Sequence, residues 1–240
     1  MRPATEGEAF NMRAEIHPGT GLQYITVVPD EYTEGDSYPL VVMLHGFGAN
    51  MQDLAGLAPA INPTGYVYAC PNAPIPFNLA PGHTGYGWMT PRGGGTPEET
   101  ANSESLLGNF FDNVFQQFNV SPGGAVLLGF SQGGGMTYRC GLGRADSFAG
   151  LVALSATLPE QETLAERLPA ERNQPIFIAH GRHDQMVTED TAHSAKSFLE
   201  GNGYSPEFHI YEMAHEISGD VLNDLVPWLT GVLPPLEPGA

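Results

Sequence analysis

Residues 125–135 read Ala125-Val126-Leu127-Leu128-Gly129-Phe130-Ser131-Gln132-Gly133-Gly134-Gly135. The first part is an apolar run typical of a strand buried on both faces, and the last part opens a helical pattern. Between them, Gly129, Ser131 and Gly133 form a G-x-S-x-G pattern, which in a strand–turn–helix setting projects the serine hydroxyl from a sharp turn. We therefore expect Ser131 to be a nucleophile; the alternative is an ordinary tight turn with a capping serine.

Working outward, strand-like and helical patterns alternate along the chain, which predicts an α/β fold with a mostly parallel central sheet and helices on both faces. The expected strands are Leu22–Val28, Leu40–Leu44, Tyr66–Cys70, Ala125–Phe130, Leu151–Leu154, Ile176–Ala179 and Glu207–Tyr211. The expected helices lie at about 51–58, 97–118, 133–141, 160–168, 188–201 and 218–232. In such sheets ligands bind beyond the carboxyl ends of the strands, so chemistry is expected in the loops that follow them.

The chain of 240 residues is within the range of one domain, and we expect residues 1–12 and 233–240 to be loosely ordered ends. The net charge of −18 predicts repulsion from nucleic acid and from anionic lipid. No apolar stretch is long enough to cross a bilayer, and the amino-terminal residues lack a secretory pattern. Two cysteines, Cys70 and Cys140, are too few for a disulfide framework. These features favour a cytoplasmic protein. We also expect a monomer or a homodimer.

A serine hydroxyl needs a base to take its proton and a third group to orient that base. Two strand ends downstream of Ser131 offer them: Asp184 follows the expected strand at 176–179, and His215 follows the one ending at Tyr211. The order serine, acid, histidine is the order that this architecture uses. We therefore expect His215 to be the general base and Asp184 the orienting acid.

Other residues near these loops compete for the same roles. His180, His183 and His209 are alternative bases, although His180 is better explained as ordering the turn after its strand. Glu189 and Asp190 are alternative acids, although both suit the first turn of a helix for electrostatic reasons alone. His180, His183 and Asp184 could ligate a metal, but no further ligand-spaced residues accompany them. We expect neither a metal nor a cofactor.

Two backbone amides are candidates for an oxyanion hole, the pair of donors that binds the negative oxygen of an acyl-transfer intermediate. The amide of Gln132 is at the start of the helix that follows the serine, and the amide of Phe47 lies in the glycine-rich turn His45-Gly46-Phe47-Gly48 after an early strand. Residues 71–97 form a proline- and glycine-rich connection that we expect to shape a site. Large apolar side chains in the loops that should face Ser131 are candidates for the substrate pocket, although core packing explains them equally well: Phe77, Trp88, Met89, Leu158, Met186 and Met213.

With these residues placed, the sequence resembles the phospholipase/carboxylesterase family of α/β-hydrolases, which includes bacterial carboxylesterases and acyl-protein thioesterases. The likeness covers about residues 22–232 and depends on four separate blocks. These are Leu44–Asn50 with Asp53-Leu54, Gly129–Gly134, Leu154–Pro159, and His180-Gly181-x-His183-Asp184-x-x-Val187. The resemblance implies that Ser131, Asp184 and His215 form a catalytic triad, and that small acyl esters or thioesters are the substrates.

Some residues depart from the family pattern: Ala49-Asn50 stands in place of Gly-Asp, and Ala156 in place of a frequent glycine. The bacterial esterase branch is the closer match. We expect a serine carboxylesterase that hydrolyses small carboxylic acyl esters through an acyl-enzyme on Ser131. The alternatives are an acyl thioesterase, a lysophospholipase or a peptidase with the same triad, or a non-catalytic ligand-binding relative.

Overall fold

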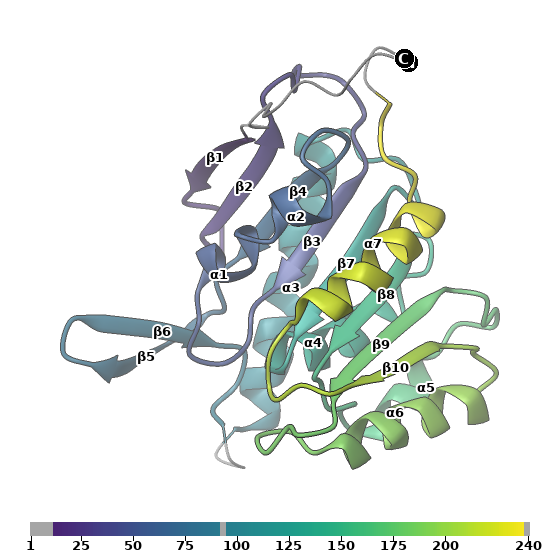
Figure 1. Cartoon of the computed structure of the whole chain (residues 1–240). Helices are drawn as coiled ribbons and strands as arrows, with labels where there is room; N and C mark the ends of the chain where they lie inside the picture. The colour runs from purple at the N-terminus through teal and green to yellow at the C-terminus, as the bar shows by residue number, and fades with distance from the viewer. Residues whose placement is uncertain (1–11, 92–94, 238–240) are drawn as a thin grey trace.

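The computed structural model describes residues 12–91 and 95–237 and shows an α/β fold built on an eight-stranded sheet (Figure 1). The strand order is β1-β2-β4-β3-β7-β8-β9-β10; the first two neighbouring pairs are antiparallel and the other five are parallel. The strands of the sheet are β1 (Met12–His17), β2 (Tyr24–Pro29), β3 (Leu40–Leu44), β4 (Val67–Pro71), β7 (Ala125–Phe130), β8 (Phe148–Leu154), β9 (Ile176–Gly181) and β10 (Glu207–Tyr211). This is the mostly parallel arrangement that the sequence predicts.

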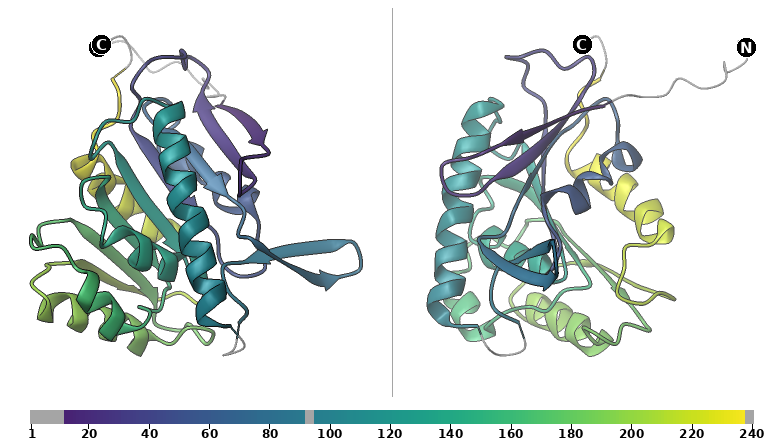
Figure 2. Two further views of the ribbon diagram at one scale, coloured as in Figure 1. Left: turned by 180° about the vertical axis from the view of Figure 1, so that it is seen from behind. Right: turned by 90° about the vertical axis from the view of Figure 1, so that its left-hand side faces the viewer.

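Helices cover the sheet on both faces (Figure 2). One face is covered by α1 (Met51–Ala55), α2 (Ala58–Ile61) and α7 (Gly219–Val232). The other face is covered by α3 (Pro97–Gln117), α4 (Gln132–Gly141), α5 (Gln161–Arg167) and α6 (Glu189–Gly201). The strands β3 and β4 are buried along their whole length, as expected of strands between two helical layers.

The apolar runs at the centre of the sheet predicted their strands well. Three strands, β3, β7 and β10, have the bounds expected from sequence, and the others differ by a few residues at their ends. The helix α3 is long because Thr96 and Glu99 form a capping box at its start and because its apolar face is continuous. Because the strands β3, β7, β8, β9 and β10 are parallel, they end on the same side of the sheet, where the candidate residues lie.

Three elements differ from the expectation. The helix expected at 51–58 is two short helices: α1 ends before Gly56, and α2 begins after Leu57 with Pro59 in its first turn, where a proline is tolerated. The edge strand β1 was missed because its side chains are mostly exposed and carry no apolar run. The connection at 71–97 contains a hairpin, β5 (Ile75–Ala80) and β6 (His83–Gly87), that extends away from the body in Figure 1. Pro76 is tolerated there because a two-stranded ribbon has free edges.

The two ends of the chain differ from the expectation of loose order where the structure describes them. Met12 pairs with Pro29 in the sheet, Leu233 is buried, and the backbone N–H of Leu236 donates to the carbonyl of Gly65 at 2.9 Å. Residues 1–11 and 238–240 lie outside the described residues. Both cysteines are buried and free, and burial raises the pKa of each thiol. Within residues 12–91 and 95–237, no helix is both long and apolar enough to cross a bilayer.

Candidate active site

Ser131 lies in the turn between β7 and α4 with a φ of 55° and a ψ of −118°. A non-glycine residue adopts this left-handed backbone only where its surroundings enforce it. Here the backbone N–H of Ser131 donates to the carbonyl of Leu154 at 2.8 Å, which fastens the turn to the end of β8. A Cβ at Gly129 would overlap the Gly133 carbonyl, and a Cβ at Gly133 would overlap that of Leu44. Both outer glycines of the G-x-S-x-G pattern are therefore required by close backbone packing.

His215 joins Ser131 to Asp184. Its Nε2 lies 2.9 Å from the Ser131 Oγ, and its Nδ1 lies 2.6 Å from the Asp184 Oδ2. The carboxylate accepts, so Nδ1 carries the proton and Nε2 is free to accept from the serine hydroxyl. The three residues follow the ends of β7, β9 and β10, which bring side chains as far as 84 positions apart in the sequence into contact.

Asp184 is buried, and each of its oxygens has a partner. The Oδ1 accepts the backbone N–H groups of Met186 and Val187, both at 2.8 Å, and the Oδ2 accepts the His215 Nδ1–H. These bonds fix the carboxylate in one orientation. His180 is fully buried behind it, with its Nε2 2.7 Å from the Val187 carbonyl and 3.5 Å from the Asp184 Oδ2. His180 therefore orders the turn, as its position after the strand suggests.

The other candidate bases and acids lie away from Ser131. His183 is exposed and its Nε2 pairs with Glu212 at 2.8 Å; His209 pairs with Glu207 on the edge strand. Glu189 pairs with Arg182 and His193 at the surface, and Asp190 is exposed in the same first turn of α6. Among the described residues, no three such side chains are grouped so that they could hold a metal ion.

The two candidate oxyanion donors lie on either side of Ser131. Gln132 is the first residue of α4, so its N–H is at the positive end of the helix dipole. The turn that contains Phe47 passes close to the serine: a Cβ built at Gly46 would lie 3.3 Å from the Ser131 Cβ. In the part of the chain that the structure describes, neither the Phe47 nor the Gln132 backbone N–H is used in a hydrogen bond. Both amides are available to a substrate oxygen.

His45, just before this turn, is a buried support of the backbone. Its Nε2 accepts the N–H of Ala73 at 3.0 Å, so its Nδ1 carries the proton and donates to the Gly46 carbonyl at 2.7 Å. Burial lowers the pKa of His45 to about 4, although the bond to Gly46 acts in the opposite direction. The imidazole is therefore neutral at pH 7 and acts in the packing of the turn.

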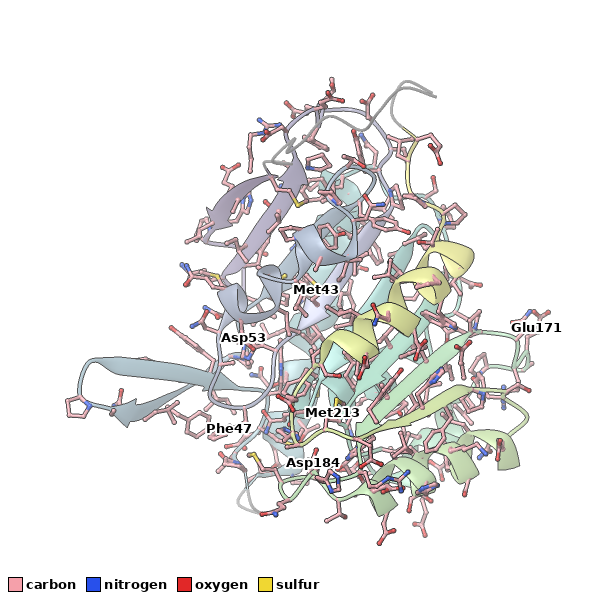
Figure 3. All side chains as sticks on the ribbon, in the orientation of Figure 1. Met43, Phe47, Asp53, Glu171, Asp184 and Met213 are labelled. Carbon is pink, nitrogen blue, oxygen red and sulfur yellow. The ribbon has the colours of Figure 1, made fainter. Side chains whose placement is uncertain are left out.

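The candidate pocket residues fall into three groups. Trp88 has no exposed surface, so it belongs to the core and does not line an open pocket. Leu158 and Met213 are also buried, whereas Phe77 and Met89 are partly exposed and Met186 is 78% exposed. Phe77 packs edge-on against the exposed ring of Phe47, with centroids 4.8 Å apart. Figure 3 places Phe47, Met213 and Asp184 at the same end of the sheet.

No sequence pattern predicts the contacts of the Gln132 side chain. Its Oε1 accepts the backbone N–H of Trp88 at 2.6 Å, and its Nε2 donates to the carbonyl of Met89 at 2.8 Å. The partners are 43 and 44 positions away, so no local pattern reports the contact. The side chain of Gln132 therefore connects the serine turn to the segment that leaves the hairpin.

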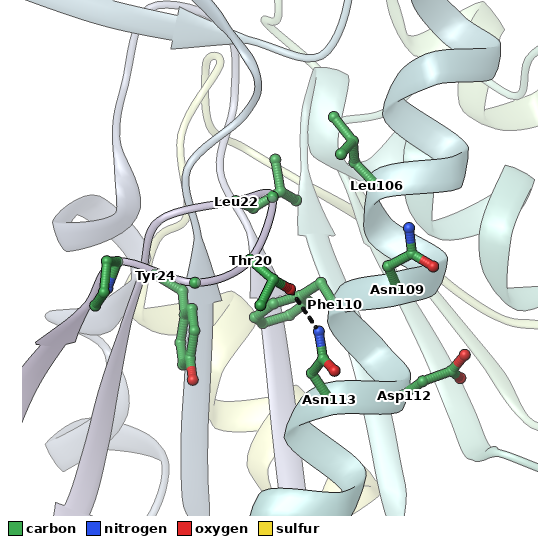
Figure 4. Close-up of a pocket in the computed structure, with 11 residues that line it drawn as sticks. Thr20, Leu22, Tyr24, Leu106, Asn109, Phe110, Asp112 and Asn113 are labelled. Atoms are coloured by element: carbon green, nitrogen blue, oxygen red, sulfur yellow. Dashed lines mark hydrogen bonds between the residues drawn. The ribbon is translucent and has the colours of Figure 1, made fainter.

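A cavity of about 630 Å³ lies elsewhere, between the segment at 18–24 and α3 (Figure 4). Asn113 donates to Thr20 across it at 3.0 Å, and the two aromatic residues in its wall, Tyr24 and Phe110, are largely buried. None of its lining residues belongs to the group around Ser131. This cavity holds no nucleophile, base or orienting acid comparable to that group.

Comparisons with known proteins agree with the fold. The phospholipase/carboxylesterase family model matches residues 31–232, so the chain belongs to this family of hydrolases, as the sequence motifs predict. Acyl-protein thioesterase 1 from Gibberella zeae is 29% identical over 182 residues, 70% of this chain and 77% of the relative. A probable carboxylesterase from Oryza sativa subsp. japonica is 27% identical over 203 residues, 79% of this chain and 76% of the relative.

Solved structures share the architecture. The crystal structure of esterase PE8 has a TM-score of 0.74 at 23% identity and covers 92% of this chain and 99% of its own. Acyl-protein thioesterase 2 from Zea mays has a TM-score of 0.70 at 21% identity and covers 88% of this chain and 98% of its own. At this level of identity the likeness establishes the α/β-hydrolase fold, and the chemistry has to be argued from the site.

Proposed function

We propose that the protein is a serine carboxylesterase that hydrolyses small carboxylic acyl esters, with Ser131 as nucleophile, His215 as general base and acid, and Asp184 as orienting acid. The observation that carries the proposal is the continuous chain of hydrogen bonds from the Ser131 Oγ through His215 to Asp184, at 2.9 and 2.6 Å. Such a chain is the requirement for activating a hydroxyl at neutral pH. Hydrolysis of a small-molecule ester by this route needs no cofactor.

The reaction has two halves. In the first, the Ser131 Oγ bonds to the carbonyl carbon as its proton moves to the His215 Nε2, and the carbonyl oxygen becomes an oxyanion held by the N–H groups of Phe47 and Gln132. When the tetrahedral intermediate collapses, the bond to the leaving alkoxide breaks and His215 returns the proton to it. In the second half, water takes the place of the alcohol. Its oxygen bonds to the acyl carbon as His215 takes its proton, and the bond to the Ser131 Oγ then breaks as His215 returns that proton to the serine.

The acyl group would lie against the partly exposed apolar side chains near the site. Phe47, Phe77, Met89 and Met186 present ring and thioether surface there. Leu158 and Met213 are buried, and Trp88 acts only through the packing of the core. Pliable methionines suit acyl groups of varied shape.

A second candidate, acyl thioesterase activity, is favoured by a specific observation: one of the matched relatives is named acyl-protein thioesterase 1. The same residues would cleave a thioester, because the triad determines the type of reaction and does not determine whether an alcohol or a thiol leaves. A lysophospholipase would also use them. The expected monomer or homodimer and the cytoplasmic location stay predictions.

A substrate panel tests the proposal. Purified protein is given p-nitrophenyl esters of increasing acyl length, acyl thioesters, lysophospholipids and peptides, and initial rates are compared with those of the Ser131→Ala variant. The proposal expects the highest kcat/KM on short esters and none of this turnover in the variant. A preference for thioesters would move the assignment to the second candidate. No turnover of any acyl substrate by the native protein would refute both and favour a ligand-binding relative.

A further inference from the structure

Both polar atoms of the Gln132 side chain are hydrogen-bonded to the backbone of another segment, although the residue lies next to the proposed nucleophile. Its carbonyl oxygen accepts from the backbone N–H of Trp88 and its amide nitrogen donates to the carbonyl of Met89. These are two neighbouring backbone groups of opposite polarity. A primary amide offers both a donor and an acceptor, so it satisfies both at once, which neither a carboxylate nor an apolar side chain can do.

The segment held by Gln132 is also bonded to the turn that contains Phe47. The indole Nε1–H of Trp88 donates to the carbonyl of His45 at 2.9 Å. The backbone N–H of Gly48 donates to Tyr86, and the N–H of Tyr86 donates to Ala49, both at 2.8 Å. Residues 86–89 are therefore fastened to the serine turn on one side and to the 45–49 turn on the other.

Packing leaves little room for these segments to move. A Cβ at Gly87 would lie 2.9 Å from the Phe47 ring, 2.9 Å from the Phe77 ring and 3.3 Å from the Gln132 Oε1. Trp88 is fully buried, and its carbonyl accepts the Ser103 hydroxyl at 2.6 Å. A displacement of residues 86–89 would thus be transmitted to the backbone on both sides of Ser131.

We propose that the side chain of Gln132 is a positioning residue that sets the separation of the two oxyanion donors, its own backbone N–H and that of Phe47. It acts through Trp88 and Met89 and does not touch the substrate. The inference depends on the proposed acyl-transfer function, because only a developing oxyanion requires both amides at once. An error of about 1 Å in such a site costs on the order of 10²-fold in rate.

Gln132→Met tests this role, because methionine keeps the length of the side chain and removes both hydrogen bonds. On the shortest p-nitrophenyl ester that the enzyme turns over, kcat is expected to fall about 10- to 100-fold, while KM changes by less than about threefold. A trifluoromethyl ketone, which forms a tetrahedral oxyanion adduct with the serine, is expected to lose affinity by the same factor as kcat/KM. Gln132→Glu keeps only the acceptor and is expected to lose at least as much kcat.

Ser103→Ala is the matched control, because it removes a buried hydrogen bond to the carbonyl of the same Trp88 and leaves the bond from the Trp88 N–H to Gln132 in place. It is expected to lower Tm at least as much as Gln132→Met and to keep kcat within about twofold. A kcat for both Gln132 variants within twofold of the native protein would overturn the proposal. Equal losses of kcat in Ser103→Ala and Gln132→Met would overturn it as well, since the effect would then be general loosening around Trp88.

The outcome for the proposed function is read separately. If the native protein is active, Ser131→Ala is inactive and the Gln132 variants are normal, only the positioning role fails. If the native protein has no turnover, or if Ser131→Ala retains it, the acyl-transfer function on Ser131 fails and the positioning role falls with it. Near-UV circular dichroism of each variant shows whether its tertiary packing is retained.

Discussion

Two neighbouring strand ends of this sheet carry a serine in the left-handed region, and among the described residues only one of the two hydroxyls has a histidine within hydrogen-bond distance. Ser131 follows β7 with φ at 55°, and Ser155 follows β8 with φ at 48°. Both N–H groups donate at 2.8 Å to the next strand along, Ser131 to Leu154 and Ser155 to Ala179. Ser155 is fully buried, and its Oγ has no hydrogen-bond partner among the described residues. Unusual backbone geometry therefore does not by itself indicate a nucleophile; what distinguishes Ser131 is the histidine within hydrogen-bond distance of its hydroxyl.

The largest expected effect is the contrast between alanine substitutions at these two serines. Ser131→Ala should remove turnover, a loss of at least about 10⁴-fold, because it removes the hydroxyl that lies 2.9 Å from the His215 Nε2. Ser155→Ala should keep kcat within about twofold, since its hydroxyl contacts no group of the site. Ester hydrolysis and labelling by a serine-directed fluorophosphonate measure both. Persistent labelling of Ser131→Ala would break the comparison.

The next effect concerns Asp184, the residue proposed to orient His215. Asp184→Asn should lower kcat by about 10⁴-fold, because an amide at this position no longer selects the tautomer of His215 in which Nε2 accepts. Asp190→Asn, at an exposed carboxylate in the first turn of α6, is the control and should leave kcat unchanged. Steady-state rates of both variants decide the matter. Similar rates for the two variants would remove Asp184 from the mechanism.

A third effect concerns His45, the buried histidine just before the turn that contains Phe47. It is measured as the dependence of the free energy of unfolding on pH. The pKa of His45 is lowered to about 4 by burial, against about 6.5 in the unfolded chain, so acid favours the unfolded state. The stability contributed by the neutral imidazole is complete above pH 6.5 and is lost between pH 6.5 and 4, about 3 kcal/mol in all.

His45→Gln supplies the comparison for that measurement. The variant should be less stable at pH 7, because the hydrogen bonds to Ala73 and Gly46 are disturbed. Its free energy of unfolding should, however, fall less between pH 6.5 and 4 than that of the native protein. Urea unfolding at a series of pH values gives both curves. Parallel curves would show that His45 does not titrate on unfolding.

The smallest effect concerns the close packing of α4 against the turn that contains Ser155. Ala156, after Ser155, faces Gly134 of α4 so closely that a Cβ at Gly134 would lie 2.5 Å from the Ala156 Cβ. Gly134→Ala should therefore lower the free energy of unfolding by about 1–3 kcal/mol. Gly201→Ala in α6, where a Cβ would meet nothing within 4 Å, should not destabilise the protein. Thermal unfolding separates the two outcomes, and in the double variant with Ala156→Gly the loss at Gly134 should shrink.

The central fold was predictable because its determinants are local. Apolar runs such as 125–130 specify buried strands, and glycines around Ser131 specify the turn. The hairpin was not predicted because its prolines are typical of loops, although Ile75, Phe77 and Leu79 alternate as strand residues do. That alternation was the available signal.

The finer parts of the site were not predictable, because they depend on contacts between distant segments. Whether Trp88 is core or pocket wall depends on how residues 86–89 pack against the 45–49 turn, and sequence leaves both open. The contacts of Gln132 are of the same kind. Convergence of Ser131, Asp184 and His215 was accessible because parallel strands share one carboxyl edge.

The position of β10 has a consequence for how the molecule acquires its chemistry. This edge strand pairs only with β9, and the loop that follows it carries His215. A growing chain can therefore form the turn around Ser131 and still lack the group that makes the hydroxyl reactive. The hydrogen bond between His215 and Ser131 therefore depends on the pairing of β10 with β9, and a partly folded chain without that pairing lacks the proposed base.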